Sequence, residues 1–160
     1  MSLVGISSLE FIPRYISDSM TPIDSDFEYP FEKDHLDTGF ESNGEMIYYT
    51  RINESGAVIE FTGGPHWLFV HEGGCVSCHA TDGKGGVSIM MGNVIPPDIR
   101  YKSLSSGEQH MNHVPYDEES LKKAIREGID SEGIPLDLTM PRWEMADEDV
   151  NGLIGHLKTL

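Results

Sequence analysis

The chain has only two cysteines, and they lie three residues apart with a histidine directly after the second, in the run Cys75-Val76-Ser77-Cys78-His79. Two cysteines cannot supply the dense disulfides of a small secreted scaffold, and they cannot supply the four thiolates of a structural zinc site. A chain of 160 residues is long enough to bury one modest hydrophobic core with an appendage. The fold must therefore depend on that core and on whatever chemistry the cysteine run supports.

Four interpretations of this run are open. A thioredoxin-like redox pair needs a preceding strand in a βαβ unit, whereas the flanks here are glycine-rich or helical. A zinc site needs two further ligands, and His79 directly follows Cys78, which is too close for the usual ligand spacing. Two inert buried thiols are the third interpretation. The fourth is covalent haem attachment, in which the two thiols add to the vinyl groups of one porphyrin and the histidine binds the iron. The run favours this fourth interpretation.

The haem interpretation requires a second axial ligand, and an electron carrier commonly uses methionine. The chain has eight methionines. Met140 precedes a proline in a loop between the two clearest helices, where its thioether is free to turn toward a metal. Met145, at the start of the last helix, is interpreted as core packing. The pair Met90-Met91 follows His79 too closely to reach the opposite face of a haem.

The first part of the chain predicts irregular structure followed by a small β-hairpin. Residues 1–45 carry scattered aromatic residues without a helical or strand period, which indicates a loop-rich arm. Two β-prone runs within residues 46–62 flank the turn residues 53–56 and predict the hairpin. We therefore expect residues 1–62 to form an N-terminal extension and residues 63–160 to form the main domain.

The main domain is predicted to be mainly α. Asp117 is a good N-cap, Leu121, Ala124 and Ile125 form one apolar stripe, and Gly128 ends the helix. A last helix is expected from about residue 146 to the end of the chain, because acidic residues begin it and an apolar stripe runs along it. The other segments predict a short helix at residues 66–71 and loops at residues 80–115 and 129–141.

These features together resemble a class I cytochrome c. The resemblance covers residues 63–160 and is carried by motifs in a fixed order: the CxxCH run, the glycine-rich turn 82–86, the proline-containing segment 95–99, the helix ending at Glu127-Gly128, the run Met140-Pro141-Arg142-Trp143, and the terminal helix 149–160. It implies helices packed around one covalently bound haem c per chain. The loop-rich arm and the small β-hairpin of residues 1–62 lie outside the resemblance.

The resemblance also implies roles for individual residues. Cys75 and Cys78 are expected to be the thioether anchors of the haem. His79 is expected to be its proximal ligand, and Met140 its distal ligand.

Further residues are expected to surround the haem. The resemblance implies that a carbonyl of Pro96 or Pro97 accepts a hydrogen bond from the other ring nitrogen of the proximal histidine. It also makes Arg100, Tyr101 and Trp143 candidate donors to the haem propionates.

Three other histidines bear on this expectation. His156 follows Gly155 in the terminal helix, where the family usually has an aromatic residue crossing a glycine of the first helix. His110 and His113 lie in a loop that could fold over the haem edge. If either replaced Met140 at the iron, the reduction potential should fall.

The formal net charge is −16. A chain this acidic would repel a phosphate backbone and has no basic stripe, so we expect no nucleic-acid partner. No apolar run approaches the length of a membrane span. The charge has two interpretations: redox partners with basic docking surfaces, or solubility in an acidic native environment.

We expect a monohaem electron carrier without substrate chemistry of its own. The alternatives are a haem-based gas sensor, a peroxide-reducing haem protein, or the cytochrome subunit of a larger respiratory oxidoreductase. The first eight residues lack the features of a secretory signal. Because haem c attachment is associated with extracytoplasmic space, we expect a periplasmic or otherwise extracytoplasmic protein whose export signal has been removed.

Overall fold

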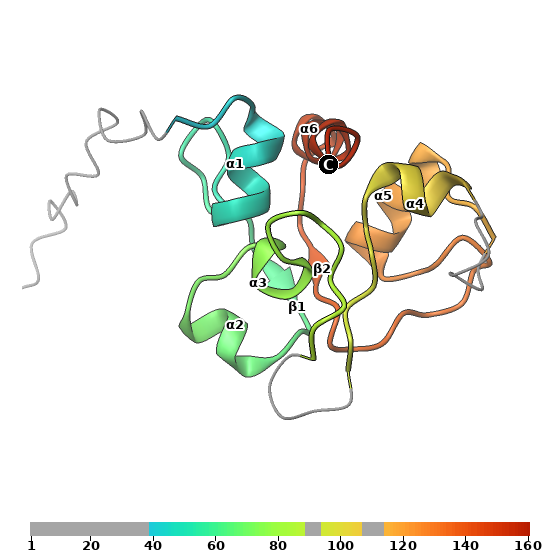
Figure 1. Ribbon diagram of the computed structural model, residues 1–160. Helices are drawn as coiled ribbons and strands as arrows, with labels where there is room; N and C mark the ends of the chain where they lie inside the picture. The colour runs from blue at the N-terminus through green and yellow to red at the C-terminus, as the bar shows by residue number, and fades with distance from the viewer. Residues whose placement is uncertain (1–38, 89–93, 107–113) are drawn as a thin grey trace, which may run out of the picture. The chain divides into compact units, whose positions relative to one another are not determined.

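The computed structural model describes residues 39–88, 94–106 and 114–160. The arm predicted for residues 1–45 lies mostly outside these ranges, and so do Met90-Met91, His110 and His113. Within the described ranges the chain is mainly helical, as predicted (Figure 1). The elements are α1 (Asn43–Thr50), β1 (Phe61–Thr62), α2 (His66–Val70), α3 (Val76–His79), α4 (Tyr101–Ser106), α5 (Glu118–Glu127), β2 (Arg142–Trp143) and α6 (Asp147–Leu157). None of these helices is long and apolar enough to cross a membrane.

Helix α1 stands where the first strand of the hairpin was predicted, so that prediction was wrong. Ser42 caps the helix, because its hydroxyl accepts a hydrogen bond from the Glu45 backbone N–H at 3.1 Å. The Glu45 carboxylate in turn accepts from the Glu41 N–H at 2.6 Å. Residues 46–48 are buried against the rest of the domain. Capping and burial together outweigh the β-propensity of this run.

The second predicted strand pairs with a distant segment. Ile52 and Val58 form a single antiparallel bridge around the predicted turn, but no ladder follows from it. Strand β1 pairs instead with β2, with Phe61 opposite Trp143 and Thr62 opposite Arg142. The segment that follows Met140 is therefore tied to the chain just before α2.

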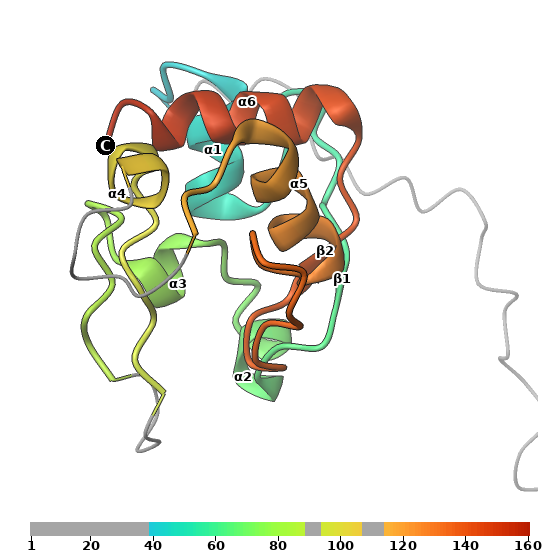
Figure 2. The same ribbon diagram turned by 90° about the vertical axis from the view of Figure 1, so that its right-hand side faces the viewer.

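Helices α1 and α6 lie side by side, as Figures 1 and 2 show from two directions. Gly44 and Gly152 permit the close approach: a Cβ on Gly44 would lie 1.9 Å from the Gly152 carbonyl oxygen. One turn along α1, the ring of Tyr48 lies 5.0 Å from the ring of His156. The described part of the predicted extension, residues 39–62, thus shares one hydrophobic core with residues 63–160.

The helices predicted in the main domain are present. Helix α2 begins after Pro65, and α6 covers most of the predicted last helix. Helix α5 has a reciprocal cap between Asp117 and Ser120, and it ends at Gly128 with a left-handed φ of 66°. Helix α4 lies in a segment that was predicted to be a loop. Its six residues give too little sequence for a helical period to be visible.

Candidate cofactor site

The cysteine run forms the single turn of helix α3. The N–H groups of Cys78 and His79 both donate to the carbonyl of Cys75, at 3.1 and 2.9 Å. Residues three and four apart lie on one face of a helix, so the two thiols and the imidazole share a face. Both cysteines are free thiols.

Helix α1 supports this turn from behind. The Tyr48 hydroxyl donates a hydrogen bond of 2.6 Å to the carbonyl of Ala80, at the end of α3. At the other end, a Cβ on Gly74 would lie 2.5 Å from the carbonyl oxygen of Tyr48. The glycine before the cysteine run therefore allows the backbone of α1 to contact the start of α3 directly.

The imidazole of His79 is buried and oriented. Its residue is 6% exposed, and Nδ1 lies 3.0 Å from the carbonyl oxygen of Pro97. A carbonyl only accepts, so Nδ1 carries the proton and the Nε2 lone pair is free to bind a metal. Burial lowers the pKa of His79, although the Pro97 hydrogen bond and the Asp98 charge oppose this effect. The neutral imidazole is the form that ligates metals.

The segment that carries the Pro97 carbonyl packs closely against a glycine turn. Gly86 donates its N–H to the Pro96 carbonyl at 2.8 Å. Gly85 has a φ of +58°, and a Cβ there would lie 2.2 Å from the Pro96 oxygen and 2.6 Å from the Pro97 oxygen. Only glycine fits this approach, which keeps the acceptor of His79 in place.

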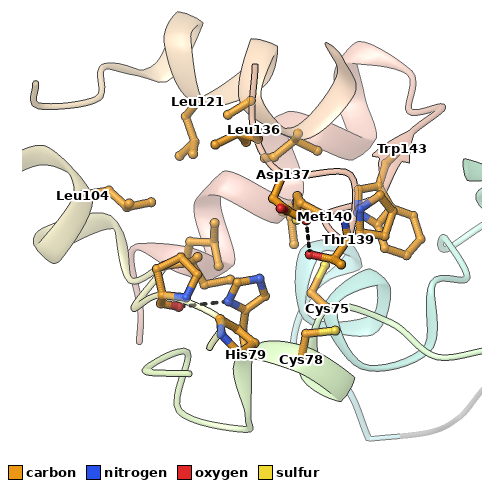
Figure 3. Close-up of a pocket in the computed structure, with 18 of the residues that line it drawn as sticks. Cys75, Cys78, His79, Leu104, Leu121, Leu136, Asp137, Thr139, Met140 and Trp143 are labelled. Atoms are coloured by element: carbon orange, nitrogen blue, oxygen red, sulfur yellow. Dashed lines mark hydrogen bonds between the residues drawn. The ribbon is translucent and has the colours of Figure 1, made fainter. Parts of the chain in front are cut away.

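A cavity of about 250 Å³ opens in front of this histidine. The apolar stripe predicted for α5, made of Leu121, Ala124 and Ile125, forms part of its wall, and Leu153 and Leu157 of α6 form another part. The predicted site residues that line the cavity are Cys75, Cys78, His79, Pro96, Pro97, Met140 and Trp143. Figure 3 shows the cysteines and His79 along the lower side, with Met140 above them among Asp137 and Thr139.

Met140 is carried by a tightly bonded loop. Its N–H donates to the Asp137 carbonyl at 3.1 Å, and the Asp137 carboxylate accepts from the Thr139 N–H at 2.8 Å. Gly64 donates to the Leu138 carbonyl at 2.9 Å. Met145 is 8% exposed and belongs to the hydrophobic core, as predicted.

Two of the predicted site residues are not among those that line the cavity. Arg100 forms a two-nitrogen contact with Asp98, with Nη2 2.5 Å from Oδ2 and Nε 3.0 Å from Oδ1. Tyr101 begins α4, and the Lys158 ammonium lies 4.9 Å above its ring. Trp143 does line the cavity and is 3% exposed, packed on the ring of Phe61.

The surroundings of the two thiols favour their protonated form. Burial raises the pKa of Cys75 to about 12, with a smaller contribution from Cys78, and burial also raises the pKa of Cys78. A catalytic CxxC pair has a lowered thiol pKa instead. Among the described residues, no three or more His, Cys, Asp or Glu side chains are grouped closely enough to hold a metal ion.

Comparisons of the chain with protein-family models, curated proteins and solved structures found no match. The interpretation of the site therefore depends on its geometry alone. Sequence reasoning named Cys75, Cys78, His79 and Met140, which all line the cavity, but it missed the contributions of Leu68, Leu104 and Tyr116 to the wall. It also assigned no role to Arg142, whose contacts depend on the folded loop.

Proposed function

We propose that this protein is a c-type cytochrome that carries single electrons. In this proposal Cys75 and Cys78 hold one haem c through thioether bonds, and His79 and Met140 are the axial ligands of its iron. One observation carries the proposal. These four side chains line a single apolar cavity, and the histidine is fixed through Nδ1 so that Nε2 remains free.

The donor set fits a haem. A neutral imidazole and a soft thioether are common axial ligands of haem iron in electron carriers. The thiols of Cys75 and Cys78 lie one helical turn apart beside His79, as attachment to one porphyrin requires. The surrounding wall is built from aliphatic and aromatic side chains, which suits an apolar macrocycle.

The residues around the cavity have distinct tasks in this proposal. A bound haem supplies reversible one-electron transfer at its iron. The Pro97 carbonyl increases the basicity of the His79 ring, which favours the oxidised state. Met140 has the opposite effect, because a thioether ligand raises the reduction potential. The apolar wall excludes water from the ligands and so limits solvent reorganisation.

The polar side chains near Met140 are bonded to each other. Asp137 and Thr139 line the cavity on that side. The Thr139 hydroxyl donates to the Asp137 carboxylate at 2.7 Å, so the two satisfy each other. A peroxide-reducing site would need an acid–base group directed toward the iron.

We further propose an extracytoplasmic location and a basic redox partner. The first follows from thioether attachment of the haem, and the second from the net charge of −16.

The test compares two methionine variants of the haem-loaded protein. Met140→Leu removes the thioether from the cavity wall, while Met145→Leu makes the same chemical change in the core. The oxidised wild type should show the weak far-red absorption band of an iron–thioether bond. The band should disappear in Met140→Leu and persist in Met145→Leu. Its persistence in both variants would mean that Met140 is not the ligand.

A further inference from the structure

We infer that Arg142 is the positioning residue that holds the Met140 loop against the cavity. The inference rests on the proposed function, since it concerns how the distal ligand is presented. The side chain lies two residues after Met140, in β2, and it turns back over the loop that precedes it.

The guanidinium bonds to backbone carbonyls of the segment that precedes the ligand and to the carbonyl of the ligand residue itself. Its Nη1 donates to the carbonyl of Asp137 at 3.0 Å and also to the carbonyl of Met140 itself. Its Nη2 donates to the carbonyl of Leu136 at 2.8 Å, with the carbonyl of Gly128 at 3.5 Å. One planar group thus joins the end of α5, the start of the loop and the residue that carries the thioether.

The partners of Arg142 are backbone carbonyls, and none of the ion pairs in the described residues includes it. A surface ion pair would leave the loop free to move. Charge-assisted bonds to several carbonyls instead fix the loop backbone. The β1–β2 pairing opposite Thr62 and the contact with Gly128 in turn hold Arg142 in place.

Lysine cannot replace this arrangement. It keeps the positive charge but has a single ammonium in place of the planar fork. Arg142→Lys therefore removes the hydrogen bonds that position the loop while it keeps the positive charge. Arg126→Lys is the matched control, because Arg126 pairs with the carboxylate of Asp147 at 2.8 Å and lies outside the Met140 loop.

Three readouts are taken on the whole chain. Amide hydrogen exchange measures the loop directly, at the N–H groups of Leu136 and Met140, which donate to Gly128 and Asp137. We expect exchange there to be about tenfold faster in Arg142→Lys. The far-red band of the oxidised haem protein should weaken, and the reduction potential should fall. Arg126→Lys should change none of these.

A glycine pair provides an independent test that leaves Arg142 intact. A Cβ on Gly128 would lie 2.1 Å from Nε of Arg142, whereas a Cβ on Gly133 meets nothing within 4 Å. Both glycines have positive φ, so alanine strains the backbone at either position. Gly128→Ala should therefore reproduce the faster exchange and the weakened band, and Gly133→Ala should not.

The outcomes separate the two proposals. If exchange in the loop is unchanged in both Arg142→Lys and Gly128→Ala, the inference about Arg142 is overturned. If exchange rises but the band is unchanged, Arg142 fixes the loop without fixing the ligand, and the inference is also overturned. If the wild type binds no haem, the proposed function fails, and the exchange measurement still judges whether Arg142 holds the loop.

Discussion

Replacing Gly44 with alanine should separate helices α1 and α6. The added Cβ would lie 1.9 Å from the Gly152 carbonyl oxygen and 2.8 Å from the Leu153 nitrogen. These contacts are with backbone, so no side-chain rotation relieves them, and the helices must move apart by about 1.5–2 Å to reach ordinary contact. Overpacking of this kind costs about 1–3 kcal/mol, while alanine returns at most about 1 kcal/mol of helix propensity. The net loss in unfolding free energy should be about 1–2 kcal/mol.

Two glycines of α6 are the controls for this change. A Cβ on Gly152 has its nearest neighbour at 3.4 Å, and a Cβ on Gly155 meets nothing within 4 Å. Gly155→Ala should therefore stabilise the protein by about 1 kcal/mol, with Gly152→Ala between the two extremes. Urea unfolding followed by circular dichroism measures all three. The close crossing would be refuted if Gly44→Ala unfolded at the same urea concentration as Gly155→Ala.

Three further predictions concern pH, potential and partner. Burial lowers the pKa of His156, so the folded state favours the neutral ring while the unfolded chain binds a proton below about pH 6.5. The unfolding free energy should thus fall as the pH drops through this region, and it should fall less steeply in His156→Phe. The same dependence of unfolding free energy on pH in the wild type and in His156→Phe would contradict this. Gly85→Ala should displace the Pro97 carbonyl from His79 and so raise the reduction potential. Gly86→Ala is the control, because Gly86 also has a positive φ but a Cβ there has its nearest neighbour at 3.9 Å, and it should leave the potential unchanged. Equal potentials in the two variants would contradict this prediction. With the net charge of −16, electron transfer to a basic redox protein should slow steeply with ionic strength, and a flat response would exclude steering.

The sequence predicted correctly those elements whose cap, apolar stripe and end residue lie close together in the chain. Helix α5 has its cap at Asp117, its stripe, and its stop at Gly128 within one continuous segment, so the sequence was sufficient. Its stripe also proved to be a wall of the cavity. The carbonyl of Pro96 or Pro97 was expected to accept a hydrogen bond from His79, and the acceptor is the Pro97 carbonyl.

The missed elements depend on partners far away in the chain. Helix α1 is rich in β-prone residues, and its packing requires Gly152 in the last helix. A capping signal was nevertheless present, with Ser42 followed three residues later by Glu45. The pairing of Phe61 with Trp143 carries no local signal, because two-residue strands have no visible period. The role inferred for Arg142 depends on the same pairing.

Intact-mass measurement of the denatured protein tests the central claim most directly. The protein is produced in a host that attaches haem c and is then unfolded in acid, which releases a haem that is not covalently bound. We predict that the chain keeps the added mass of one haem, and that Cys75→Ser with Cys78→Ser loses it. A wild-type chain with the mass of the polypeptide alone, produced beside a known c-type cytochrome that does retain its haem, would contradict the account.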